Sequence, residues 1–155
     1  SGASWEAYCD GQHRTAKALG ILVWVDHYGP RVQHLRQGTY RITGKAPPDY
    51  LGMMRGGRLL AVEAKRRSGR LAIEGDTRES IERHQLDRLA EVEGGGGLGL
   101  VLVEFVRAGG VTRFAAPWSA VLTAARSPMG GPRSVGPEDL RGWEVSVPCY
   151  LSRFV

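Results

Sequence analysis

A nearly continuous run of Leu and Val at residues 98–106 most constrains how this chain can fold. Four glycines precede the run, and the pair Gly109-Gly110 follows it. A strand without polar alternation needs a covering layer on both of its faces. The run therefore predicts a strand inside a layered α/β domain, and we expect it at the centre of the sheet.

Helical periodicity at other places predicts the covering layers. Apolar side chains recur at three- and four-residue steps over residues 4–19. A second helix is expected from an N-cap at Thr77 or Ser80 to about residue 93, with a Gly-rich stop after it. Pro117 favours the start of a third, short helix that ends at residue 125.

Short apolar or β-rich runs predict the remaining strands. We expect strands at residues 21–25, 40–43 and 111–115, and a hairpin of residues 49–54 and 58–65 joined by Arg55-Gly56-Gly57. Beyond residue 125 the sequence predicts an exposed loop at 127–137, one helical turn at 138–140 and an extended tail at 145–155. The order of elements favours a mixed β-sheet flanked by helices.

Length and composition exclude several classes of protein. A chain of 155 residues fits a single domain over residues 1–155 and is too short for two ordinary domains. Its 42% hydrophobic and 24% charged residues argue against intrinsic disorder and fibrous repeats. The longest apolar runs are far shorter than the roughly 20 residues of a membrane span. Two isolated thiols, Cys9 and Cys149, fit a reducing compartment, so we expect a cytoplasmic protein.

Positive charge is concentrated in one quarter of the chain. The net charge is +5, but residues 31–70 alone carry ten bases against two acids, and the rest of the chain is net negative. Such a run is often only a solvated basic face. The two acids inside it, Asp49 and Glu63, suggest a more specific role.

Asp49, Glu63 and Lys65 form a pattern that fits metal-dependent chemistry. Glu63 and Lys65 are expected on one face of the strand at 58–65, at its end, and the hairpin can bring Asp49 beside Glu63. Two adjacent carboxylates repel each other, and a divalent cation removes that repulsion by binding both. A surface strand can also show Glu and Lys on one face, so the triplet Glu63-Ala64-Lys65 has little weight without Asp49 and the basic run.

These residues resemble the PD-(D/E)XK signature of restriction-endonuclease-like nucleases. The pair Pro48-Asp49, the triplet Glu63-Ala64-Lys65 and the later segment at residues 82–86 are most similar to the RecU-type Holliday junction resolvases. The resemblance extends from the first helix to about residue 118, with a weaker similarity at residues 150–152. This chain is shorter between residues 28 and 48, where those enzymes carry a stalk that enters the junction.

The resemblance implies roles for individual residues. Asp49 and Glu63 would be acidic metal ligands, the carbonyl group of Ala64 a further ligand, and Lys65 the catalytic lysine. A glutamate of the first helix also belongs to the family's site, and Glu6 is the matching residue, while Asp10 and His13 are expected to be bystanders. Gln85 matches a glutamine that approaches the site, although an ordinary half-exposed helix residue is the alternative interpretation.

The resemblance also implies an activity and partners. It predicts a homodimer that uses Mg²⁺, or Mn²⁺ in its place, to cut four-way DNA junctions symmetrically and leave 5′-phosphate ends. Basic side chains around the site would hold phosphates without reading base sequence. The residues predicted for this role are Arg31, Arg36, Arg41, Lys45, Arg66, Arg67 and Arg70.

Two other functions remain open from the sequence alone. The same site could serve a nuclease for flaps, single strands or duplex DNA, or the chain could be a non-catalytic nucleic-acid-binding protein. No nucleotide cofactor is expected, because the chain has no phosphate loop with a GK[ST] sequence. The glycine run at residues 94–99 satisfies GxGxxG, but it follows a helix and precedes a strand, which is the reverse of the dinucleotide-binding order.

Overall fold

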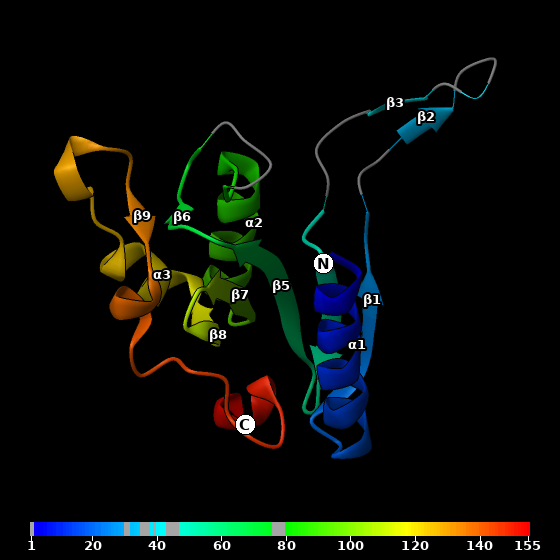
Figure 1. Cartoon of the computed structure of the whole chain (residues 1–155). Helices are drawn as coiled ribbons and strands as arrows, with labels where there is room; N and C mark the ends of the chain where they lie inside the picture. Colours follow the sequence, from blue (N-terminus) through cyan, green and yellow to red (C-terminus); the bar gives the residue numbers. More distant parts are fainter. Residues whose placement is uncertain (1, 30–31, 35–37, 39, 43–46, 76–79) are drawn as a thin grey trace.

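A mixed five-stranded sheet forms the middle layer of the molecule and has helices on both faces (Figure 1). The computed structural model describes residues 2–29, 32–34, 38, 40–42, 47–75 and 80–155. In spatial order the strands are β1 (Leu22–His27), β4 (Tyr50–Met54), β5 (Arg58–Arg67), β7 (Leu98–Arg107) and β8 (Gly110–Pro117). β5 and β7 run parallel, and the other neighbouring strands are antiparallel. The predicted mixed sheet with flanking helices is confirmed.

β5, and not β7, occupies the centre of the sheet. β8 follows β7 through the predicted Gly-Gly turn and pairs with it along its whole length, so β8 takes the outer edge. β7 is therefore second from the edge, which corrects the expectation that the Leu/Val run lies at the centre. The run is nevertheless buried on both faces, as its composition predicts.

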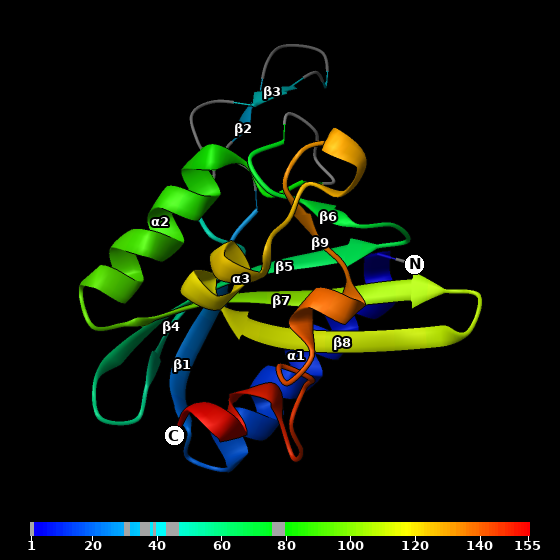
Figure 2. The ribbon, with the colours of Figure 1, turned by 90° about the vertical axis from the view of Figure 1, so that its left-hand side faces the viewer.

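Side chains of the central strands alternate between two apolar cores. On one face Leu60 and Val62 of β5 pack with α1 (Gly2–Ala18) and with the C-terminal segment. On the other face Ala61 packs with α2 (Arg83–Gly94) and α3 (Trp118–Ala124). Figure 2 shows α2 and α3 on the face of the sheet opposite α1. The charged residues at the end of β5 follow the same alternation, so neighbouring residues there point to opposite faces of the sheet.

α2 begins later than the sequence predicts. Ile81 has extended backbone, because its N–H donates to the carbonyl of Ala72 and its carbonyl accepts from Glu74. Glu82 is therefore the N-cap, and its N–H donates to Oε1 of Gln85 at 2.9 Å. Thr77, one of the two predicted caps, lies outside the described residues, and Ser80 is buried before the helix.

The C-terminal part of the chain is more ordered than the sequence predicts. The expected loop contains the 3-10 helix η2 (Pro128–Gly130) and the strand β9 (Ser134–Val135), which pairs with β6 (Leu71–Ala72). The predicted helical turn is present as η3 (Pro137–Leu140). The tail expected to be extended ends in a 3-10 helix, η4 (Tyr150–Phe154).

Tyr150 fastens that tail to α1. Its ring is fully buried, its N–H donates to Oε1 of Gln12 at 2.9 Å, and its hydroxyl lies 2.8 Å from Nε2 of His13. Helical spacing puts His13 in line with Glu6, Asp10 and Lys17, which predicts a place on the polar side of α1. The tail covers His13 instead, and burial lowers its pKa to about 4. At the other extreme Leu19, expected in the apolar stripe, lies beyond the helix end and is 48% exposed.

Two short antiparallel strands, β2 (Val32–His34) and β3 (Tyr40–Ile42), extend away from the body of the molecule (Figure 1). They lie in the segment between residues 28 and 48. β3 confirms most of the strand expected at residues 40–43. No helix in the described part of the chain has the length and apolar character needed to cross a membrane.

Candidate active site

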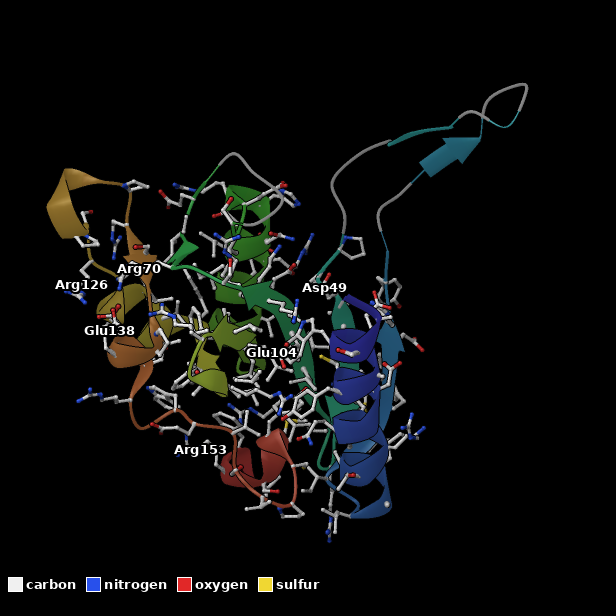
Figure 3. The ribbon with its side chains drawn as sticks, viewed as in Figure 1. Asp49, Arg70, Glu104, Arg126, Glu138 and Arg153 are labelled. Atoms are coloured by element: carbon white, nitrogen blue, oxygen red, sulfur yellow. The ribbon has the colours of Figure 1, made fainter. Side chains whose placement is uncertain are left out.

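The site begins where the pairing between β4 and β5 ends. Tyr50 is the first residue of β4 and pairs with Val62, so β5 continues beyond its neighbour from Glu63 onward. The carboxylate of Asp49 replaces the missing strand, because its Oδ2 accepts the N–H of Ala64 at 2.9 Å. Figure 3 shows Asp49 beside the first turns of α1. The predicted proximity of Asp49 to the Glu63-Ala64-Lys65 triplet is thus present.

Glu63 is a fully buried carboxyl group. Its Oε1 accepts a hydrogen bond from Nε2 of Gln85 at 2.5 Å, and Nζ of Lys65 lies 3.8 Å from the same oxygen. Burial and, after it, the negative charge of Asp49 raise the pKa of Glu63 to about 9, and the positive charge of Lys65 partly opposes this shift. In the absence of a bound cation this carboxyl therefore holds a proton at neutral pH.

Two buried polar atoms near Asp49 have no hydrogen-bond partner. Within the described residues these atoms are Oε2 of Glu63 and Nε1 of Trp5. A hydrogen bond between the side chains of Glu63 and Asp49 also contributes to the raised pKa of Glu63, so the two carboxyl groups face each other. A divalent cation bound by both groups would take the place of the proton between them. Oε2 of Glu63 is the atom expected to bind a cation together with Asp49.

A small cavity of about 110 Å³ lies on the other side of Asp49. Glu6, Asp49 and Ala64 all line it, so three of the predicted ligand residues border the same cavity. The other lining residues are Trp5, Cys9, His27 and Tyr50. Burial raises the pKa of the Cys9 thiol to about 12, so this group is neutral at physiological pH.

The predicted residues fall on two faces of β5. Glu63 and Lys65 point toward α2, where Gln85 hydrogen-bonds Glu63, whereas Ala64 packs toward α1 and Glu6. Asp49 touches both groups, because it hydrogen-bonds the Ala64 backbone and acts electrostatically on Glu63. The site therefore surrounds the end of one strand.

The oxygen atoms present fit a hard divalent cation, although they do not form a closed cage. Two carboxylates and a backbone carbonyl are the donor types that Mg²⁺ binds, and Mg²⁺ commonly keeps several of its waters. Among the residues that the structure describes, no group of three or more His, Cys, Asp or Glu side chains is arranged to hold a metal ion. Glu6 lines the cavity but does not complete a preformed carboxylate triad with Asp49 and Glu63.

Sequence reasoning missed His27. This residue ends β1 opposite Tyr50, and the two rings stack with centroids 4.5 Å apart at the cavity wall. Only the register between β1 and β4 brings His27 to Asp49, and no local pattern in the sequence reports that register.

The basic residues predicted to bind phosphates have different environments. Arg31, Arg36 and Lys45 lie outside the described residues, and Arg41 belongs to β3. Arg66 donates from Nε to Glu104, and Arg67 donates from Nε to the carbonyl of Arg70. Arg66 and Arg67 directly follow Lys65, so both remain close to the candidate site.

Arg70 has a structural role that the sequence does not predict. Its guanidinium donates to the hydroxyl and carbonyl of Ser134 and forms ion pairs with Glu138 and Asp139. Figure 3 shows Arg70 with Glu138 and Arg126 on the β9 side of the molecule, away from Asp49. All three nitrogens of this guanidinium serve protein acceptors, so Arg70 holds β6, β9 and η3 together.

Replacing Arg70 by Gln is expected to destabilise the fold with little effect on DNA affinity. The substitution leaves the partly buried carboxylate of Asp139 with weaker pairing, which costs about 2 kcal/mol of unfolding free energy. Urea denaturation measures the loss, and fluorescence anisotropy with labelled DNA measures the affinity. A large loss of DNA affinity at unchanged stability would instead support the predicted contact of Arg70 with DNA.

No known protein family matches the chain by sequence, and no curated protein is significantly similar to it. A functional conclusion therefore depends on the geometry around Asp49 and Glu63.

Proposed function

We propose that this protein is a divalent-metal-dependent DNA endonuclease with a restriction-endonuclease-like core, and that it resolves four-way junctions. The observation that carries the proposal is the fully buried carboxyl of Glu63, which lies beside the carboxylate of Asp49 and 3.8 Å from the ammonium group of Lys65. A stable fold gains nothing from two adjacent carboxylates in a buried place, because each disfavours the charge of the other. Such an arrangement is typical of a functional site.

Asp49 and Glu63 would hold the cation through carboxylate oxygens, with the Ala64 carbonyl as a further oxygen donor and Glu6 available from the cavity wall. Mg²⁺ or Mn²⁺ in this place would polarise a phosphodiester and lower the pKa of an attacking water. Glu63 must lose its proton to bind a cation, and Lys65 favours that loss.

Lys65 and Gln85 complete the proposed chemistry. The ammonium group of Lys65 lies 3.8 Å from Glu63 and is mostly buried, so it can neutralise the charge that develops on a phosphate during hydrolysis. Gln85 acts as a positioning residue: its Nε2 holds Glu63, while its Oε1 caps α2. The orientation of Glu63 is thus tied to the first turn of a helix.

Positive charge supports a nucleic-acid substrate, and we propose a four-way junction as that substrate. In the sequence, a balance of +8 over residues 31–70 flanks the two site acids, which suits a polyanionic backbone. A four-way junction has two-fold symmetry, and a homodimer would present one site to each of two equivalent strands. We therefore propose paired cuts that leave ligatable 5′-phosphate ends, by a protein that acts in the cytoplasm.

A cleavage assay on mobile and fixed four-way junctions tests the proposal directly. We expect symmetric nicks with Mg²⁺ or Mn²⁺, no cleavage after EDTA treatment, and resistance to excess linear duplex as competitor. Preferential cleavage of flaps, single strands or duplex DNA would support a nuclease activity and reject the junction as its substrate. A protein that binds junctions but never nicks them with either metal would be a non-catalytic binding protein.

A further inference from the structure

Three charged side chains form a row across β5, β7 and β8 on the sheet face that carries α1. Arg66 pairs in register with Glu104, and Glu104 pairs in register with Arg113. Cross-strand neighbours on one face lie close enough for their side chains to interact. The row therefore alternates positive, negative and positive charge.

Glu104 holds both guanidinium groups. Its carboxylate is buried, with one oxygen 2.8 Å from Nε of Arg66 and the other 2.9 Å from Nε of Arg113. Each oxygen is used once, and each arginine gives only its Nε atom. The Nη nitrogens of both arginines make no hydrogen bond to any residue that the structure describes.

Tyr8 supports Arg113 from the side of α1. The guanidinium carbon lies 4.1 Å from the centroid of the Tyr8 ring, which is a cation–π stack. Tyr8 itself stacks on Trp5, with ring centroids 5.4 Å apart. Trp5 lines the cavity beside Asp49, so the arginine row is connected to the candidate site by two packed rings.

We propose that Arg66 and Arg113, oriented by Glu104, form a binding site for a phosphate of the DNA backbone next to the one that is cut. Both arginine side chains are 37% exposed, and each retains Nη donors for an anion. One arginine is enough to neutralise Glu104. The second gives the group of three side chains a net charge of +1, and the contacts with Glu104 hold both guanidinium groups in place. This inference rests on the proposed function and extends it to a named phosphate contact.

The distance along β5 fits a neighbouring phosphate. Ala64 lines the cavity, and Arg66 follows two residues later on the same face, about 7 Å along the strand. Arg113 lies two strands further across the sheet. A DNA strand whose cut phosphate lies at the end of β5 would therefore have a neighbouring phosphate within reach of Arg66.

Arg113→Gln tests the contact, because this variant leaves Arg66 to pair with Glu104. DNA affinity is measured by anisotropy with labelled junction in Ca²⁺, which separates binding from cleavage. We expect roughly a 5-fold weaker affinity and a log–log salt slope smaller by about 0.9, the value for one lost phosphate contact. Wild-type affinity and slope in R113Q would overturn the site.

Arg153→Gln is the matched control. Arg153 also stacks on an aromatic ring, that of Trp143 at 5.1 Å, and its replacement removes the same charge. Figure 3 shows it near the C-terminal segment, well separated from Asp49. We expect R153Q to retain the wild-type salt slope. An equal reduction in both variants would mean that net charge alone sets the affinity, which also rejects the proposal.

Glu104→Gln separates orientation from charge. The substitution makes the protein more positive, so nonspecific attraction predicts tighter DNA binding. If Glu104 orients the two arginines, affinity falls at least about 2-fold and R113Q adds little in this background. Tighter binding by E104Q would contradict the orienting role. If thermal unfolding shows that E104Q does not fold, Arg113→Lys replaces it: this variant keeps the charge and loses the planar fork, and we expect weaker binding.

Failure of this inference is distinguishable from failure of the proposed function. Normal junction cleavage with unaltered binding by R113Q would reject only the phosphate site. Weakened binding by R113Q in a protein that never cuts DNA would support the phosphate site and reject the nuclease.

Discussion

Replacing Asp49 by Asn is expected to abolish Mg²⁺-dependent cleavage, with a loss of at least roughly 10³-fold in rate. The amide oxygen can still accept the Ala64 N–H, so the end of β4 keeps its anchor on β5. One of the two carboxylates that would hold the cation is lost. Gel analysis of labelled junctions under single-turnover conditions measures the rate.

The same variant is expected to keep its fold and its DNA affinity. Thermal unfolding and anisotropy in Ca²⁺ should give values close to those of the wild type, because the substitution removes negative charge near a phosphate. Asp87→Asn is the matched control, since Asp87 is an exposed carboxylate paired with Arg83 on α2. Cleavage by D49N at the wild-type rate would remove Asp49 from the site, and the proposed nuclease with it.

Local sequence patterns predicted the elements of the site better than their surroundings. An apolar strand that ends in Glu63-Ala64-Lys65 and a Gly-Gly turn together determine the hairpin, and the period of two along a strand determines which residues share a face. The register of the hairpin then places Asp49 beside Glu63. These features depend on residues close in sequence, and the structure contains them.

Features that depend on pairing between distant strands could not be predicted from the sequence. Arg66, Glu104 and Arg113 form a row only because β5 pairs with β7 in one particular register, and a shift by one residue would turn Glu104 to the other face. His13 shows the same limitation. Its position on α1 predicts exposure, but Tyr150, 137 residues later, covers it.

Tertiary pairing also displaced the start of α2. Helical periodicity and capping residues favour an early start, but the hydrogen bonds of Ile81 with Ala72 and Glu74 keep that residue extended. Gln85 consequently lies in the first turn, where its two polar atoms can serve the N-cap and Glu63 at once. The predicted start of α2 was therefore wrong at the turn that contacts the candidate site.

Replacing Glu63 by Gln is expected to stabilise the metal-free protein at alkaline pH while it abolishes cleavage. The pKa of Glu63 is raised from 4.5 to about 9, mainly by burial and then by the charge of Asp49. Between these values the folded carboxyl keeps a proton that the unfolded chain releases. The stability that this group contributes is complete below pH 4.5 and decreases as the pH rises toward 9, by up to about 1.4 kcal/mol per pH unit.

The neutral amide in E63Q resembles the protonated acid and does not titrate. Wild type and variant should therefore be similarly stable near pH 5, and E63Q should be more stable by at least about 2 kcal/mol at pH 8. Urea denaturation in EDTA across this range measures the difference, in which the titration of other groups cancels to first order. A difference that does not change with pH would show that Glu63 is ionised in the folded protein.

Divalent cations should reverse that order of stability. A cation that binds only the folded wild type adds unfolding free energy in proportion to RT ln(1 + [L]/Kd), and it also replaces the proton on Glu63. We expect millimolar Mg²⁺ or Mn²⁺ to raise the melting temperature of the wild type at pH 8 and to leave E63Q unchanged. An equal response of both proteins would place the cation elsewhere. If Glu63 serves catalysis, E63Q should therefore be more stable without metal and should not respond to added metal. The reason is that the buried charge of Glu63 destabilises the fold until a cation is bound.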